Sequence, residues 1–236
     1  MSLPLGQRAV KGFPRFGTHL HRPPPPVPPD PVIEIGGAVT APLSVPLARL
    51  AALPRRQLTA DFHCVAGWSA TGLRWDGVAF ETFYGTIIEP ALQPGAAITY
   101  VVFRGLDGYR SIVSIEDALA EDVLIAQRLG GRPLDPNRGA PVRVVSPRQY
   151  GFVSTKHLCR IEVRTAAPRQ TYDHLEPFQR ALVRGPLIQP HPRARAWEEE
   201  RHRYLPAWAV RPIYRLLIPP FTFLSARGSS DSHGRD

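Results

Sequence analysis

The sequence contains little cysteine, a single methionine and no long apolar run. Two cysteines in 236 residues, Cys64 and Cys159, exclude a framework of several disulfides. No stretch of about 20 consecutive apolar residues is present, so a transmembrane helix is not expected. The first residues, MSLPLGQRAVKGFPRFG, contain no apolar segment of signal-peptide length and no twin arginine. These absences predict a cytoplasmic protein with reduced thiols and no transmembrane segment.

Acidic residues are outnumbered, and the basic ones are dispersed. There are 29 Lys and Arg against 20 Asp and Glu, which gives a formal net charge of +9. A basic balance suits an anionic partner such as nucleic acid, an anionic membrane surface or a phosphate group on a ligand. The sequence has no run of five or six basic residues and no nucleic-acid-binding motif. We therefore expect no nucleic-acid partner.

Proline, in contrast, is abundant, with 27 residues. The stretch HRPPPPVPPDP favours an extended polyproline II conformation, so residues 1–31 are predicted to form an extended arm that contacts the core. Residues 32–166 alternate strand-like segments with short helices and predict one strand-rich α+β domain. Residues 167–236, with scattered Pro, His and Arg, predict an irregular extension that packs on this domain. We expect a monomer.

Hydrophobic periodicity predicts the individual elements. One apolar stripe marks a helix that ends near Pro90; it comprises Phe80, Phe83, Tyr84, Ile87 and Ile88. Further short helices are predicted at 46–53, capped by Ser44, after the capping pair Ser114 and Asp117, and on the surface at 196–204. Strands are predicted at 57–67, 97–104, 109–113, 122–129, 140–146 and 157–163. The segment VIEIGGAV predicts two strands joined by a Gly36-Gly37 turn.

Cys64 stands in the short segment ADFHCVAGWS without a second cysteine nearby. Three interpretations follow from the residues alone. A zinc site would combine it with His19, His21 and His63, but the adjacent His63 and Cys64 point to opposite faces of a strand. A nucleophile would need His157 and Asn137 as partners. A buried structural thiol is the most common role of a lone cysteine.

Three segments resemble the sulfite oxidase family of molybdenum enzymes. DFHCVAGWS followed by LRWDGVAFETFY is similar to the family's Cys-Val-x-x-Trp-Ser and Trp-x-Gly-Val segments. Residues 139–163, GAPVRVVSPRQYGFVSTKHLCRIEV, resemble the block that holds the pterin phosphate. RFGTHLHRPPPPVP resembles the N-terminal arm that contacts the pterin. The resemblance spans about residues 13–165 and implies the family's molybdopterin-binding fold.

The resemblance also implies a site for mononuclear Mo-molybdopterin. Cys64 would be the one protein ligand of the metal, as a thiolate, because the pterin supplies two further sulfurs. The remaining cofactor-binding residues that the resemblance implies are Thr18, His19, Gly105, Arg138, Arg143, Ser154, Thr155 and Lys156. Arg143 and Lys156 would supply charge to the phosphate, and Ser154 and Thr155 hydroxyl or backbone contacts.

The implied reaction is two-electron oxygen-atom transfer on a small substrate, either a sulfoxide, an N-oxide or a sulfur oxyanion. Gly17 stands where sulfite oxidases carry a substrate-binding arginine, which argues against sulfite itself. No Cys-x-x-Cys-His haem motif is present, so a separate electron-transfer protein is expected. The alternative is a non-catalytic basic binding protein that retains the fold, since Gly17 and Gly105 both replace side chains near the site.

Overall fold

The computed structural model describes residues 2–14, 23–169, 189–213 and 215–216. Thr18 and His19 lie outside the described residues, as do Gly17 and His21. Within the described part of the chain no helix is long and apolar enough to cross a membrane.

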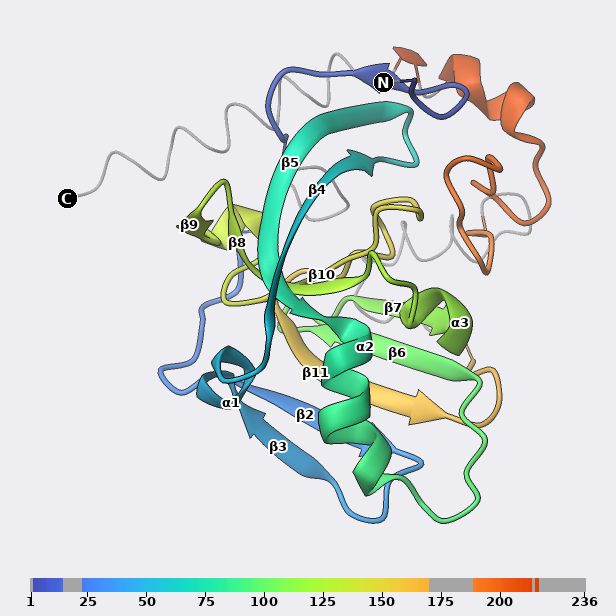
Figure 1. Cartoon of the computed structure of the whole chain (residues 1–236). Helices are drawn as coiled ribbons and strands as arrows, with labels where there is room; N and C mark the ends of the chain where they lie inside the picture. The colour runs from blue at the N-terminus through green and yellow to red at the C-terminus, as the bar shows by residue number, and fades with distance from the viewer. Residues whose placement is uncertain (1, 15–22, 170–188, 214, 217–236) are drawn as a thin grey trace.

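Two mixed sheets form the body of the protein (Figure 1). The first has the order β1-β5-β8-β10, with β4 also paired to β5 and β9 to β8. Its strands are β1 (Arg8–Ala9), β4 (Arg55–His63), β5 (Trp68–Ala79), β8 (Leu124–Leu129), β9 (Arg132–Pro133) and β10 (Arg143–Val145). The second has the order β3-β2-β11-β6-β7. It contains β2 (Val32–Gly37), β3 (Leu43–Pro46), β6 (Tyr100–Gly105), β7 (Arg110–Ser114) and β11 (Leu158–Arg164).

The helices are few and short, which confirms the α+β class. They are α1 (Leu47–Ala51), α2 (Phe80–Phe83) and α3 (Ile115–Ala118). A π-helical turn, Tyr84–Ile88, and a 3₁₀ turn, Glu89–Ala91, continue α2 to the predicted end near Pro90. The predicted cap of α3 is also confirmed, because the backbone N–H of Asp117 donates to Ser114 Oγ over 3.2 Å.

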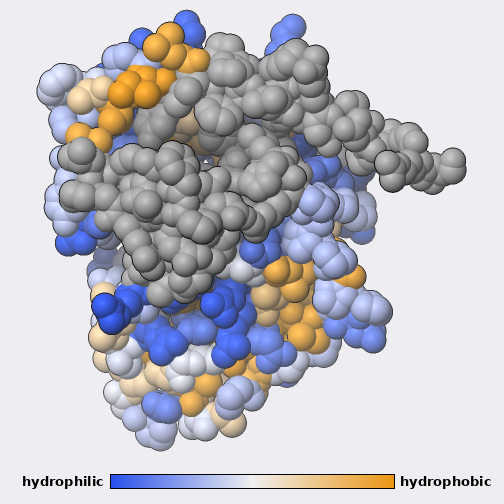
Figure 2. Space-filling view, turned by 180° about the vertical axis from the view of Figure 1, so that it is seen from behind, coloured by the Kyte–Doolittle hydropathy of each residue, from blue (hydrophilic) through white to orange (hydrophobic). Residues whose placement is uncertain are grey.

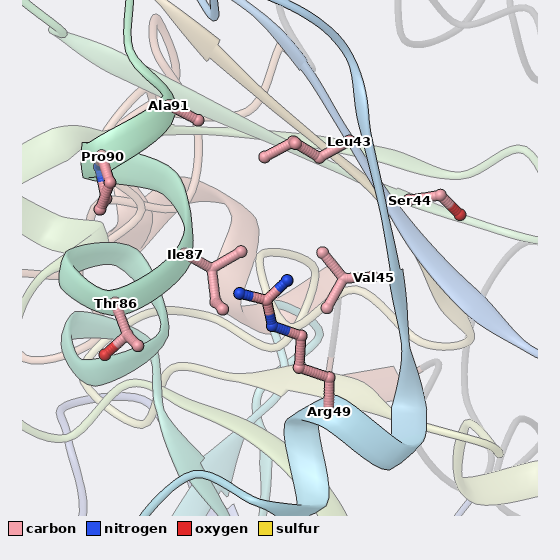
Figure 3. Close-up of a pocket in the computed structure, with 8 residues that line it drawn as sticks. All are labelled: Leu43, Ser44, Val45, Arg49, Thr86, Ile87, Pro90 and Ala91. Carbon is pink, nitrogen blue, oxygen red and sulfur yellow. The ribbon is translucent and has the colours of Figure 1, made fainter.

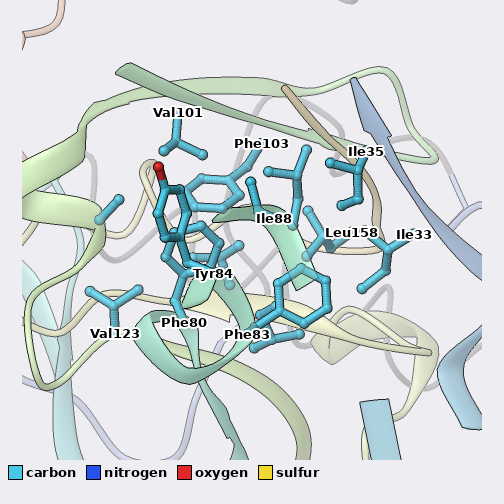
Figure 4. Packing of buried hydrophobic residues seen from close by; sticks show 14 of the residues in the cluster. Ile33, Ile35, Phe80, Phe83, Tyr84, Ile88, Val101, Phe103, Val123 and Leu158 are labelled. Carbon is cyan, nitrogen blue, oxygen red and sulfur yellow. The ribbon is translucent and has the colours of Figure 1, made fainter. Parts of the chain in front are cut away.

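The apolar stripe of the α2 segment packs on the second sheet (Figures 1 and 4). Phe80, Phe83 and Ile88 are fully buried against Ile33 of β2 and Phe103 of β6. The rings of Phe80 and Phe103 meet edge to face with centroids 5.1 Å apart. This aromatic face thus belongs to a core cluster that includes residues of both sheets, while a second cluster surrounds Trp68 and Trp75 of the first sheet.

Three sequence predictions are wrong. VIEIGG is one strand, not two, because Gly36 and Gly37 continue β2 beside β11. Gly37 has φ +92°, and a Cβ there would lie 2.1 Å from the Val163 carbonyl oxygen, so the glycine permits close strand approach rather than a turn. Ser44 does not cap α1, which follows Pro46 without a side-chain cap. Residues 196–199 form a turn and residues 200–204 are not helical, whereas residues 207–213 are helical.

Two terminal segments lie against the first sheet (Figure 1). The N-terminal segment comprises residues 2–14, and the C-terminal segment comprises residues 189–213 and 215–216. β1 runs parallel to the start of β5, with Arg8 opposite Trp68. The backbone N–H of Tyr150 donates to the Ala194 carbonyl over 2.8 Å, and that of Ala196 donates to the Arg148 carbonyl over 2.9 Å. Both terminal segments are therefore hydrogen-bonded to the loops that surround Cys64.

Apolar surface is exposed on these same segments (Figure 2). In Figure 2 it gathers at the upper end of the molecule, where the terminal segments lie. The exposed large apolar side chains of the segments are Leu5, Trp197, Tyr204, Trp208, Ile213 and Leu216.

Replacing Phe80 by alanine removes a fully buried ring from the core between helix and sheet. We expect the free energy of unfolding to fall by about 3–5 kcal/mol, because the ring's burial is lost and a cavity remains. Urea unfolding followed by circular dichroism measures the change. Thr86→Ala, on the exposed face of the same helical segment, is the control and should stay within about 0.5 kcal/mol of the parent.

Candidate functional site

Cys64 occupies the first position of the four-residue connection between β4 and β5. Its backbone N–H donates to the Trp68 carbonyl over 2.8 Å, and the Gly67 N–H donates back to the Cys64 carbonyl over 2.9 Å. Gly67 has φ +95°, a left-handed conformation that glycine adopts without strain. Two long strands therefore hold the thiol in a tight turn, where it is only 7% exposed.

Burial controls the acidity of this thiol. Desolvation raises the pKa of Cys64 to about 12, while a backbone hydrogen bond from Ala66 and the charges of Arg201 and Lys156 act in the opposite direction. The thiol is neutral in the protein alone at pH 7. Two cations nevertheless lie near enough to favour the thiolate, which is the form that a bound metal requires.

A polar chain lies beside the turn on the side of His63. Ser69 Oγ donates its proton to Gln7 Oε1 over 3.1 Å and lies 2.8 Å from His63 Nδ1. Because the hydroxyl has only one proton, Nδ1 of His63 must be the donor to Ser69. Desolvation lowers the pKa of His63, so the ring is neutral. His63 thus stabilises the turn through Ser69.

Arg143, at the start of β10, is fully buried. Its Nη1 and Nη2 groups donate to the carbonyls of Arg138 and Ser154, each over 3.0 Å, and Nε donates to the Val144 carbonyl over 3.3 Å. Three of the five guanidinium N–H groups are used in this way, which leaves two for a ligand. Among the described residues no carboxylate forms an ion pair with Arg143.

Aromatic side chains surround the Arg143 guanidinium. Its carbon lies 5.7 Å from the ring centroid of Phe13, 5.6 Å from that of Phe62 and 5.3 Å from that of Trp75. These faces stabilise a cation only partly. Desolvation, with the neighbouring charge of Arg138, lowers the pKa of Arg143 to about 9. A buried cation with carbonyl and aromatic partners alone fits an anionic ligand.

Arg138 and Lys156 add positive charge to this region. Arg138 stacks over Phe13 at 4.9 Å, and its pair with Asp135 is long, 3.9 Å. Lys156 Nζ donates to the Asn137 carbonyl over 3.3 Å, and the backbone of Lys156 passes close to Gly139. Arg138 and Lys156 are 18 positions apart in the sequence; in the fold, the charge of Arg138 acts on Arg143 and that of Lys156 acts on Cys64.

The other described candidate residues lie in the same region. Ser154 Oγ accepts from the backbone N–H of Ser146 over 3.1 Å, and Thr155 Oγ1 lies 2.8 Å from Ser111 Oγ. Both hydroxyls therefore already have protein partners. A Cβ on Gly105 would lie 2.4 Å from the Lys156 carbonyl oxygen, so this position must be glycine for the chain to pass. Gly105 thus shapes the site by its small size.

The zinc interpretation of Cys64 depends on His19 and His21, which lie outside the described residues, and it stays untested; the nucleophile interpretation depends on His157. Among residues 2–14, 23–169 and 189–216, apart from 214, no group of three or more His, Cys, Asp or Glu side chains could hold a metal. His157, the partner that a nucleophilic cysteine would need, donates from Nδ1 to the Ala140 carbonyl over 2.6 Å. Desolvation lowers the pKa of His157.

Two cavities bear on the assignment of the site. One, of about 200 Å³, lies between β3, α1 and the α2 segment; its wall includes Val45, Arg49 and Ile87 (Figure 3). None of the candidate site residues line it, so we assign it no role. The other, of about 550 Å³, is lined by Ser146, Gln149 and charged residues of the loops and the C-terminal segment. Ser146 places this second cavity one hydrogen bond from Ser154.

Sequence reasoning missed Gln7 and Arg201. Gln7 Nε2 donates to the Cys64 carbonyl over 3.1 Å. Arg201 is 1% exposed, donates from Nη1 to the Val65 carbonyl and lies over the Tyr150 ring at 4.9 Å. In the sequence Arg201 is one of several arginines in a polar stretch, and a single sequence carries no signal that sets it apart.

The residues fit a cofactor with one soft metal and one phosphate. A buried thiol is a ligand for a soft or high-valent metal centre, and the Arg143 region supplies cations and unused N–H donors for an anion. The region is continuous, because Lys156 acts electrostatically on Cys64 and contacts the carbonyl next to Arg138.

Comparisons with known proteins agree with this arrangement. Residues 21–172, more than half of the chain, match the family model described as the oxidoreductase molybdopterin binding domain. An uncharacterized oxidoreductase of Bacillus subtilis, YuiH, is 33% identical over 130 residues, which cover 55% of this chain and 63% of that protein. The protein-methionine-sulfoxide reductase catalytic subunit MsrP of Xanthomonas axonopodis pv. citri is 26% identical over 223 residues, covering 86% of this chain and 66% of MsrP.

A solved structure shares the fold. The sulfane dehydrogenase SoxCD from Paracoccus pantotrophus superposes with a TM-score of 0.52 at 20% identity, covering 59% of this chain and 39% of that one. The chain therefore spans less than two thirds of the length of these relatives. The match of the family model over the strand-rich body and the Cys64 turn shows that the chain belongs to the oxidoreductase molybdopterin-binding domain family, within the sulfite oxidase type of fold.

Proposed function

We propose that this chain binds mononuclear Mo-molybdopterin and catalyses two-electron oxygen-atom transfer on a small substrate. The observation that supports the proposal is that one buried thiol, Cys64, accompanies one fully buried guanidinium, Arg143, which forms no ion pair with a carboxylate among the described residues. When bound, the cofactor supplies the redox chemistry and the oxygen-atom transfer. The protein supplies binding, orientation and a low-dielectric surrounding.

We propose the following roles for the residues, which the sequence resemblance implies. Cys64 is the protein ligand of the metal, held by the β4–β5 turn. Arg143, with Arg138 and Lys156, neutralises the phosphate, and its two unused N–H groups donate to the phosphate oxygens. The backbone around Ser154 and Thr155 lines the phosphate position, since both hydroxyls have protein partners. Thr18 and His19, outside the described residues, stay predicted pterin contacts.

The proposed substrate is a sulfoxide, an N-oxide or a sulfur oxyanion, and we favour the sulfoxide. The support comes from the relatives that are named methionine-sulfoxide reductases. Reduction of a sulfoxide to a thioether consumes two electrons and two protons and releases water. The electrons come from a separate electron-transfer protein, which we propose as the partner. The cytoplasmic location and the monomeric state stay predictions of the sequence.

Replacing Cys64 by serine tests the metal ligand. The chain should be expressed in a host that makes the pterin cofactor. We expect near-stoichiometric molybdenum in the parent, and a visible thiolate-to-metal charge-transfer band that is lost in Cys64→Ser because a hydroxyl is a poor substitute for a soft thiolate. Metal per chain by mass spectrometry and the absorption spectrum provide the measurements.

Cys159→Ser is the matched control. Cys159 is half-buried in β11, and its thiol lies 3.5 Å from the Arg104 carbonyl, so its loss should leave the band unchanged. A parent without molybdenum and without pterin would contradict the enzyme proposal and favour the non-catalytic binding protein. A band that disappears only in Cys159→Ser would assign the ligand to the other thiol.

Replacing Arg143 by methionine tests the phosphate anchor. Loss of charge-assisted hydrogen bonds to a phosphate should weaken pterin retention by about ten- to a hundredfold. Arg143→Lys retains a charge but not the planar fork, so we expect retention between those of the parent and Arg143→Met. The measurement is pterin per chain, by fluorescence after oxidative release, for samples whose circular dichroism matches the parent.

Arg160→Met serves as the control for this experiment. Arg160 is an exposed arginine of β11, whose side chain pairs with Glu162 at 3.2 Å. Its replacement removes the same charge from the surface and should leave pterin retention unchanged. Equal retention in Arg143→Met and the parent would show that the buried guanidinium does not hold the phosphate.

A further inference from the structure

The Cys64 turn receives hydrogen bonds from three distant parts of the chain. The carbonyl of His63 accepts from the backbone N–H of Gly151 over 2.7 Å. The next carbonyl, of Cys64, accepts from Gln7 Nε2 over 3.1 Å, and the following one, of Val65, accepts from Arg201 Nη1. Three successive carbonyls are thus fixed by a core loop, the N-terminal segment and the C-terminal segment.

Arg201 joins the two terminal segments at this point. Its Nη2 group lies 3.5 Å from the carbonyl oxygens of Leu5 and Gly6, two residues or fewer from Gln7. The planar guanidinium lies over the ring of Tyr150, and Tyr150 is fully buried. The Nε of Arg201 is buried without a hydrogen-bond partner among the described residues. An arginine is rarely buried at such cost on a surface segment unless its fork has a specific task.

We propose that Arg201 is a positioning residue that locks the Cys64 turn against both terminal segments. This inference rests on the proposed role of Cys64 as the metal ligand. The fork of Arg201 fixes the Val65 carbonyl, Gln7 fixes the Cys64 carbonyl, and together they restrict the backbone that carries the thiol. The C-terminal segment, which follows the strand-rich domain in the sequence, is therefore a structural part of the ligand site.

The test uses the full chain purified without cofactor, so that its result does not depend on metal loading. Arg201→Met removes the fork and keeps an apolar stem against Tyr150. We expect the rate of Cys64 alkylation by iodoacetamide to rise about five- to tenfold relative to that of Cys159 in the same molecule, as loss of roughly one hydrogen bond shifts the local opening equilibrium. Mass spectrometry of the two cysteine peptides gives both rates.

Two further variants separate positioning from charge and from general loosening. Arg201→Lys keeps the charge but not the planar guanidinium, so most of the increase in the relative alkylation rate of Cys64 should remain. This variant also provides the test if Arg201→Met does not fold. Arg195→Gln breaks the ion pair of Arg195 with Glu200, 2.6 Å long, in the same C-terminal segment. It should leave the ratio of the two rates at the parental value.

The proposal is overturned if Arg201→Met leaves the ratio unchanged, if Arg201→Lys restores the parental ratio in full, or if Arg195→Gln raises it equally. In the cofactor-loaded protein, a shifted charge-transfer band in Arg201→Met at parental molybdenum content is the expected second readout. If the parent binds no molybdenum but Arg201→Met still accelerates the alkylation of Cys64, the proposed function is wrong and the positioning role of Arg201 stands. If the parent binds molybdenum but Arg201→Met changes neither the alkylation rate nor the charge-transfer band, the positioning role is wrong and the proposed function stands.

Discussion

The structure depends on enclosing two groups whose charged forms burial disfavours, the Cys64 thiol and the Arg143 guanidinium. Cys64 lies in a turn between two long strands, and Arg143 lies inside β10, enclosed by aromatic rings. Neither position is favourable for the protein alone, since desolvation raises the pKa of the thiol and lowers that of the guanidinium. Strands of the first sheet and the N-terminal segment contact both positions, and the C-terminal segment contacts the Cys64 turn.

The elements that obey a simple period could be predicted from the sequence. The α2 segment follows from its apolar stripe, and the cap of α3 follows from the Ser114 hydroxyl and the Asp117 amide. Predictions failed where long-range packing decides the conformation. Gly37 ends β2 with φ +92° where β11 passes too close for a side chain, and the local Gly-Gly pattern does not predict this long-range contact. The helix expected at 196–204 is absent because residues 196–199 instead form a turn and the non-helical residues after it bring Arg201 to the Cys64 turn.

The candidate site was predictable to a different degree. The resemblance of short motifs pointed to Cys64, Arg143 and Lys156, and the fold brings these residues into one region. Gln7 and Arg201 could not be found in this way, because they donate to backbone carbonyls. Every residue has a backbone carbonyl, so the identity of the accepting residue carries no signal. Their partners are fixed only once both terminal segments are placed. The cofactor roles of all these residues stay proposals.

The aromatic enclosure of Arg143 has a consequence for the life of the protein in the cell. Phe13, Phe62 and Trp75 can hold the cation before any anion arrives, so the newly made chain can fold to a receptive form. That form is less stable than the loaded one, since a ligand that binds only the folded chain adds its binding free energy to stability. Empty chains therefore unfold more often than loaded ones and are more open to proteolysis. Under the proposed role of Arg143, the buried charge that binds the cofactor would therefore also make cofactor-free molecules the less stable ones.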